Sequence, residues 1–184
     1  MKKHLLLLFI LLTSHICRTQ TMSISEEMNI GNAEAYGMIG KFSDRYLFYF
    51  IENNTVKLQA LDAKMRKIWD KELEPERKNQ ARIIEVAGSK QDFNVVYQFR
   101  KKGHNYLKAH KYDPQGKLLD SITLKDFGRD IIVPPIQYIT SEDKKVILIY
   151  YVEGNNTIKA AALGLDSIRL IWEKDFPSKL GLGR

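Results

Sequence analysis

Hydrophobic and polar residues alternate in short runs along most of the chain, and β-branched and aromatic residues are common in these runs. Asparagine, glycine, aspartate and lysine fill the gaps between the runs. Alternation with a period of two, bounded by turn-forming residues, predicts β-strands. No segment longer than about two turns has the period of a helix. We therefore expect an all-β fold.

Twelve strands are expected, at residues 35–41, 45–51, 55–61, 67–73, 81–87, 93–100, 105–112, 117–124, 132–140, 145–152, 157–163 and 168–176. In the third of these, Val56, Leu58 and Ala60 alternate with polar residues and are expected to face the core. Ile158, Ala160 and Ala162 form the same pattern. The strand that includes Pro134 and Pro135 should begin late or lie at an edge, because proline cannot donate a ladder hydrogen bond.

One segment recurs about every 51 residues. Asn54, Asn105 and Asn156 are spaced by 51 residues, and the second-strand residues Phe48, Phe99 and Tyr150 have the same spacing. The repeat predicts one four-stranded unit used three times, over residues 34–74, 80–125 and 131–176. Four-stranded units of this length point to propeller blades stacked face to face.

The turns between the expected strands contain residues that tolerate positive φ. Residues 53–54, 103–105 and 154–156, which include the three repeated asparagines, are expected to close tight hairpins. Residues 113–116, which include Pro114 and Gly116, form a second turn type, and its counterpart at residues 62–65 has lost the glycine.

The fourth strand of each unit carries a further motif. Ala60-Leu61-Asp62 is followed by Trp69, and the third unit keeps Trp172 at the matching position, whereas the second unit has no tryptophan there. Over residues 34–176 this pattern resembles the repeat of quinoprotein-type and WD-type β-propellers. The resemblance implies blades in which Trp69 and Trp172 are packing residues. It implies no activity, and no cofactor is expected.

Three blades leave the outer faces of the stack unpaired, and three arrangements remain open. The chain can be the first part of a longer propeller, two copies can close a six-bladed ring, or the twelve strands can form a β-sandwich or barrel instead.

The first 19 residues have the layout of a secretory signal peptide. Lys2 and Lys3 precede an unbroken apolar run from residue 5 to residue 12, which is too short to span a bilayer. We expect a secreted or periplasmic protein with a flexible arm at residues 20–33, a tail at residues 177–184 and no transmembrane segment in the mature chain. A lipoprotein anchored through Cys17 is the alternative, although Ile16 directly before that cysteine fits a lipoprotein signal badly.

The charge of the mature chain argues against nucleic acid as a partner. Lys2, Lys3 and Arg18 belong to the leader, which leaves 26 basic and 22 acidic residues and a net charge of +4. Nucleic-acid binding calls for clustered positive charge, and the charges here are mixed in sign.

The sharpest local charge is the basic hairpin formed by Arg100, Lys101, Lys102 and His104, which can contact an acidic glycan, an anionic lipid headgroup or a protein. Its plain alternative is a solvated turn. His110 lies six residues after His104, about 20 Å along a strand, so the two cannot share a metal ion. We expect His110 on the polar surface, and no catalytic, cofactor-binding or metal-binding residues are assigned.

These features favour a non-catalytic binding or scaffold module with a protein or glycan partner. Two alternatives are a carbohydrate-active propeller enzyme with part of its site outside this chain, and an envelope or adhesion component that forms homo-oligomers. The choice depends on chemistry that the fold class does not specify.

Overall fold

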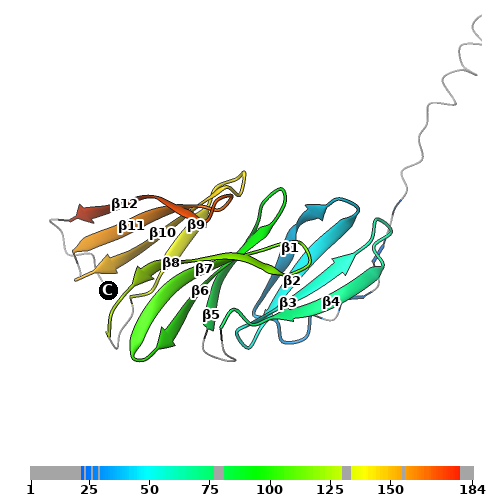
Figure 1. Cartoon of the computed structure of the whole chain (residues 1–184), viewed down its shortest axis with the longest axis horizontal. Helices are drawn as coiled ribbons and strands as arrows, with labels where there is room; N and C mark the ends of the chain where they lie inside the picture. The colour runs from blue at the N-terminus through cyan, green and yellow to red at the C-terminus, as the bar shows by residue number, and fades with distance from the viewer. Residues whose placement is uncertain are drawn as a thin grey trace, which may run out of the picture.

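The structure, a computed structural model, describes residues 22, 24–25, 27–28, 30–76, 81–129, 134–154 and 156–178. Within them the chain forms three four-stranded antiparallel sheets that stand in a row (Figure 1). The expected leader, with Cys17, and residues 179–184 of the expected tail lie outside the described residues. Among the described residues no helix is long and apolar enough to cross a membrane.

Each sheet uses four consecutive strands, and we call the sheets blades 1, 2 and 3. Blade 1 contains β1 (Ala35–Phe42), β2 (Arg45–Glu52), β3 (Thr55–Leu61) and β4 (Lys67–Leu73). Blade 2 contains β5 (Ala81–Gly88), β6 (Phe93–Lys101), β7 (His104–Tyr112) and β8 (Leu118–Asp126). Blade 3 contains β9 (Gln137–Thr140), β10 (Val146–Glu153), β11 (Thr157–Gly164) and β12 (Arg169–Pro177).

The strand order in every sheet follows the order in the chain, as it does in a propeller blade. This confirms the predicted fold class of three four-stranded blades, and it excludes a two-layer sandwich of the same strands. The expected strand bounds hold to within about two residues except in β9. That strand begins at Gln137, directly after the segment that contains Pro134 and Pro135, and it lies at the edge of its sheet as those prolines predict.

The 51-residue repeat holds for the third strands but not for the second. Val56, Leu107 and Ile158 occupy the same place in their blades, opposite Ile51, Gln98 and Val152. The gapless match of Phe48, Phe99 and Tyr150 was wrong. Phe48 pairs with Gln59, Phe99 with Tyr106 and Tyr150 with Ala160, which are different levels of the hairpin. The hairpin of blade 2 has two extra residue pairs, and the turn of blade 3 has one residue more than that of blade 1, so the second strands are shifted.

The repeated asparagines also differ in role. Asn53 and Asn54 both adopt positive φ in the first hairpin, as expected. In the second hairpin Lys102 and Gly103 take that conformation, and Asn105 is already a paired residue of β7. Asn156 directly precedes β11.

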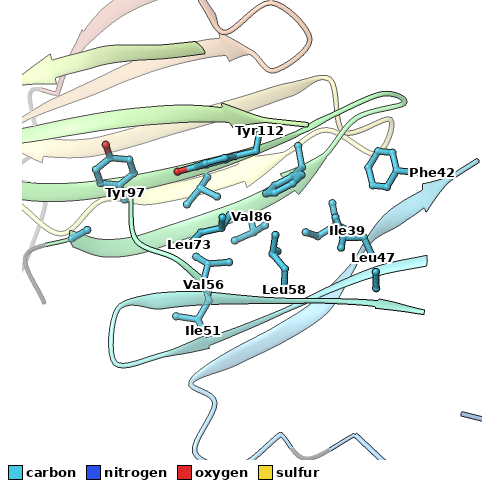
Figure 2. Close-up of a cluster of buried hydrophobic side chains, with 14 of the residues drawn as sticks. Ile39, Phe42, Leu47, Ile51, Val56, Leu58, Leu73, Val86, Tyr97 and Tyr112 are labelled. Atoms are coloured by element: carbon cyan, nitrogen blue, oxygen red, sulfur yellow. The ribbon is translucent and has the colours of Figure 1, made fainter. Parts of the chain in front are cut away.

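Blades 1 and 2 share an apolar interface. Leu47, Val56 and Leu58 of blade 1 face Tyr97 and Tyr112 of blade 2 in a buried cluster (Figure 2). At one side of this interface β1 lies against β5, and a Cβ atom added to Gly88 would lie 2.1 Å from the carbonyl oxygen of Ile39. No side chain fits there, so this glycine allows the two blades to approach.

Blades 2 and 3 are joined by a second apolar cluster and by polar contacts. Val96 and Leu107 pack against Ile147 and Leu163. The fully buried Asn94 donates a hydrogen bond to the backbone oxygen of Leu165 at 3.0 Å. At the outer strands an ion pair of 3.0 Å joins Lys125 to Glu173. Blade 2 is therefore covered on both faces, and blades 1 and 3 on one each.

The turns after β3 and β7 have the same hydrogen bonds. In each, an aspartate side chain, Asp62 or Asp113, accepts two backbone N–H groups at 2.8–2.9 Å. The fourth position has positive φ in both, +62° at Met65 and +71° at Gly116. The turn thus survives the loss of glycine in blade 1, where Met65 adopts a conformation that is costly for a side chain.

We predict opposite effects for exchanges at these two positions. Gly116→Ala should lower the free energy of unfolding by roughly 1–3 kcal/mol, because its Cβ would adopt positive φ and crowd Leu58 and Leu73 across the blade interface. Met65→Gly removes the strain and should leave stability unchanged or raise it by up to about 1 kcal/mol. Urea unfolding followed by circular dichroism measures both. Wild-type stability in Gly116→Ala would contradict the crowding.

Candidate functional site

The structure brings the four residues of the predicted basic hairpin together at the tip of β6 and β7. Lys101 pairs with His104 across a two-residue turn, and Arg100 donates a hydrogen bond to the backbone oxygen of Gly103 at 3.4 Å. Arg100, Lys101 and Lys102 are exposed, and none of them forms an ion pair with another described residue. We call these four residues the basic tip.

The basic tip is exposed because its hairpin is longer than those on either side. Tyr106 occupies the level of Thr55 in blade 1 and Thr157 in blade 3, and in both of those blades this level holds the last residue pair before the turn. Blade 2 adds two more pairs beyond Tyr106, which is about 7 Å of extra strand. The tip therefore projects past the hairpins of blades 1 and 3.

His104 is held in place by two contacts. Its Nδ1 atom lies 3.1 Å from the carboxylate of Asp126, and its ring stacks on Tyr106 with the ring centres 5.9 Å apart and the planes at 18°. The pKa of Asp126 is lowered, chiefly by a hydrogen bond from the backbone N–H of Gly128 and also by His104. Asp126 is thus ionised at neutral pH and orients the imidazole.

A series of aromatic ring contacts, some stacked and some edge-to-face, leads from His104 into the blade interface. Tyr106 stacks on Phe99 at 5.2 Å, and the ammonium group of Lys108 lies 5.1 Å from the centre of the Phe99 ring. Four further ring contacts of 5.0–6.0 Å continue the series through Tyr97, His110, Tyr112 and Phe93. The series is buried at Phe93 and partly exposed at Tyr106 and His104, so it presents ring surface beside the cations of the tip.

His110 is buried, which corrects the expectation of a surface residue. Its Nε2 atom lies 2.7 Å from the hydroxyl of Tyr97, and its Nδ1 atom lies 3.1 Å from the hydroxyl of Tyr112. Tyr97 donates its own proton to Glu76 at 3.0 Å, so it accepts from Nε2–H, and Tyr112 then donates to Nδ1. Lys108 binds the same Glu76 oxygen at 2.9 Å. We call this chain of hydrogen bonds the interblade relay, because Glu76 lies in the connection between blades 1 and 2.

Burial sets the protonation states in the relay. Desolvation lowers the pKa of His110 to about 4, with a further contribution from Lys108, so the ring is neutral at pH 7. Burial also raises the pKa of Tyr97 and raises that of Tyr112 to about 12. Burial alone would raise the pKa of Glu76, but its hydrogen bonds from Lys108 and Tyr97 lower it overall. The relay thus holds one internal ion pair and three neutral rings.

The sequence contained a signal for the buried position of His110. One face of the neighbouring strand consists of Phe93, Val95, Tyr97 and Phe99, as in a face that is covered by another layer. Residues of β7 that pair with this face share its cover. His110 lies opposite Val95 on that face.

A second polar cluster joins all three blades and was missed by the sequence analysis. Glu85 of β5 accepts a hydrogen bond from the hydroxyl of Tyr138 of β9, and Tyr49 of β2 lies within their electrostatic range. Burial raises the pKa of Glu85, while the N–H of Val86 at 2.9 Å and the nearby Lys144 oppose that rise. Glu85 occurs where the register shifts in β5, and no local pattern marks it.

The blade residues predicted from the tryptophan motif lie at matching places. Trp69 pairs with Ala60 and Trp172 with Ala162, and the register shifts directly after both alanines. Trp69 packs against the core between blades 1 and 2, whereas Trp172 is exposed. Among the described residues no group of three histidine, cysteine or acidic side chains is placed to hold a metal ion.

No protein-family model and no curated protein sequence matches this chain. The solved structures that resemble it include the following three. One, from a study of two prolyl endopeptidases, is 15% identical over 79% of this chain with a TM-score of 0.48. The β-propeller domain of Vanderwaltozyma polyspora Nup133 is 11% identical over 76% with a TM-score of 0.41. Prolyl oligopeptidase B from Galerina marginata is 12% identical over 83% with a TM-score of 0.47.

This chain spans 20%, 47% and 21% of the lengths of those three chains. Identities and TM-scores this low carry no information about activity. The assignment of three blades therefore rests on the strand pairing and on the two buried interfaces described above.

The relay predicts a specific dependence of stability on pH. Between pH 4 and pH 6.5 the unfolded chain binds a proton at His110 that the folded chain does not, so the free energy of unfolding rises with pH in this window. We expect His110→Gln to remove about 1–3 kcal/mol of the difference between pH 4.5 and pH 7. Urea unfolding at both pH values measures it. His104→Gln, at the exposed tip, should keep the wild-type difference, and the same difference in His110→Gln would contradict the assignment.

Proposed function

We propose that this protein is an exported, non-catalytic binding module that holds an anionic polysaccharide at the basic tip of blade 2. Export is supported by the leader-like pattern of the first 19 residues, with its basic start and short apolar run. Binding is supported above all by one arrangement. Three cations that have no ion-pair partner among the described residues lie beside the exposed end of the ring series.

The chemistry of this arrangement suits acidic sugars. Arg100, Lys101 and Lys102 supply positive charge for carboxylate or sulfate groups, while Tyr106 and His104 supply flat ring surface for the C–H face of a sugar ring. Asp126 keeps the imidazole of His104 in place and leaves its Nε2 atom directed away from that carboxylate. The tip extends beyond both adjacent hairpins, so a long polymer can reach it without a pocket.

The tip differs from the other basic turn of the molecule. Residues 64–67 contain three cations as well, but Arg66 is paired with Asp62 at 2.7 Å and Lys67 with Asp70 at 2.8 Å. Two of those three cations, Arg66 and Lys67, have local partners, and the cations of the tip have none among the described residues. Free charge at the tip is therefore available to a ligand.

We predict that removing the charges of the basic tip weakens the binding of an anionic polysaccharide and that removing the charges of residues 64–67 does not. The probe is polygalacturonate, followed by isothermal titration at low salt, with neutral dextran as a comparison. The triple variant Arg100→Gln, Lys101→Gln and Lys102→Gln should bind at least tenfold more weakly, and Tyr106→Ala severalfold more weakly. The matched control replaces Lys64, Arg66 and Lys67 by glutamine and should bind like wild type.

Equal losses in the tip variant and its control would show that binding depends on net charge alone and would contradict the site. No measurable binding of the wild-type protein to any of a set of carboxylated and sulfated polysaccharides would contradict the function itself.

A further inference from the structure

The face of blade 3 turned away from blade 2 has a counterpart that is buried elsewhere in the same molecule. Ile158 and Val152 of blade 3 occupy the register positions of Val56 and Ile51 in blade 1. At the outer strand, Phe176 pairs with Ile158 as Leu73 pairs with Val56. These residues therefore belong to one repeated surface, which we call the following face of a blade.

Burial of this face differs sharply between the two blades. In blade 1 the side chains of Ile51 and Leu73 are 8% and 4% exposed, because blade 2 covers them. In blade 3 their counterparts Val152 and Phe176 are 40% and 44% exposed, and Trp172, the counterpart of the packed Trp69, is 43% exposed. The following face of blade 3 has the residues of a blade interface without the next blade.

We propose that this face docks against blade 1 of a second copy of the chain, and that two copies use the contact twice to form a closed ring of six blades. The reason is that blade 1 carries the complementary repeated surface. Its face turned away from blade 2 holds Tyr46, Phe48 and Phe50 at the register positions of Ile147, Ile149 and Tyr151, which blade 3 packs against blade 2. We call this the preceding face.

The preceding face of blade 1 is not sealed by the other residues that the structure describes. Residues of the N-terminal segment, Met28 and Ile30 among them, border a hollow of about 860 Å³ over this face. The buried side chains of Phe50 and Leu61 and the charged side chains of Lys57 and Asp70 also line that hollow. The surface that it presents to an incoming sheet is therefore mixed and carries charge.

Charge selects this pairing over contact between two copies of blade 3. The charged strand residues on the following face of blade 3, Arg169 and Lys174, are both cations. Two such faces would therefore set cations against cations. The preceding face of blade 1 is mixed in sign: Asp70 and Glu72 lie at its outer strand, with Lys67 2.8 Å from Asp70 and Lys57 4.0 Å from Glu72.

The interface between blades 2 and 3 provides a precedent for this charge arrangement. There Lys125, on the following face of blade 2, pairs with Glu173 on the preceding face of blade 3. Asp70 occupies in blade 1 the register position that Glu173 occupies in blade 3, opposite Gln59 and Ala161 respectively. Lys125 lies opposite Leu107, and the same register position in blade 3 holds Phe176, so Lys174 lies two residues away, opposite Ala160. Closure therefore has an acid at the position of Glu173 and a cation close to, but not at, the position of Lys125.

The first test measures the mass of the purified protein by sedimentation velocity and light scattering over a range of concentrations. A dimer that dissociates on dilution is expected, with no larger species, because the ring leaves no open face. Tryptophan fluorescence identifies the surface. Trp69→Phe leaves Trp172 as the single reporter, and its emission should shift to shorter wavelength as the dimer forms. In the matched variant Trp172→Phe, the emission of Trp69 should not change with concentration.

A charge exchange then tests which faces meet. Asp70→Lys and Lys174→Glu should each weaken the dimer at least tenfold, and the double variant should recover most of that loss. Both sites are exposed, so circular dichroism should be unchanged.

Three outcomes would overturn the proposal. A monomer at all concentrations would mean that a sheet from another source covers the face of blade 3. A dimer in which Asp70→Lys has no effect would mean that blade 1 does not take part. Growth into larger polymers would mean that the contact forms without closing a ring.

Discussion

The fold depends on sheets that are apolar on both faces, because such a sheet is stable only between two others. Blade 2 shows this most clearly. Its strand β6 is buried from Phe93 to Tyr97 without interruption, with side chains alternately in the core shared with blade 1 and the core shared with blade 3. Burial of this kind is the main favourable term in folding, so the stack forms as a unit and each blade depends on the next.

Several polar groups are paired inside these interfaces, although the Oδ1 atom of Asn94 and the hydroxyl of Tyr151 are buried without a hydrogen-bond partner among the described residues. Asn94 is fully buried and bonds to the backbone of Leu165, and His110 is buried between the hydroxyls of two tyrosines. Each of these contacts has a direction and a fixed length, which an apolar contact lacks. They therefore fix how one blade sits on the next, while the aliphatic and aromatic side chains supply the burial.

Much of the architecture could be predicted from local pattern, since alternation and turn chemistry act within a few residues. The twelve strands and the asparagine turn at Asn53 and Asn54 are of this kind. The alignment of the second strands failed because hairpin length is decided by cross-strand pairing, which a gapless repeat does not reveal. Met65 shows a second limit of prediction from local sequence. Methionine disfavours positive φ but adopts it here, because two backbone hydrogen bonds to the Asp62 side chain define the turn.

The position of the candidate site could be predicted from the sequence, but its exposure beyond the adjacent hairpins could not. Arg100 to Lys102 are visible as a cluster in sequence, yet their exposure follows from two residue pairs by which blade 2 exceeds the blades beside it. To predict the relay from the sequence, one would have to know which blade faces cover one another. Glu76 also lies in a connection between blades that has no recognisable sequence pattern. Residues whose role depends on neighbouring blades are thus the ones that a reading of single strands misses.

The same constraint explains the apolar side chains on the outer faces of blades 1 and 3. A repeat that makes every blade apolar on both sides also makes the terminal blades apolar, unless their sequences diverge to become caps. Blade 3 has not diverged in this way, because Trp172 and Phe176 are retained at positions that are packed in blade 1. Blade 1 differs in part, because Gln59 lies on its preceding face where blade 3 has Ala161, and residues of the N-terminal segment border that face. The asymmetry gives the stack one apolar end and one mixed end, which suits a head-to-tail contact better than a contact between like faces.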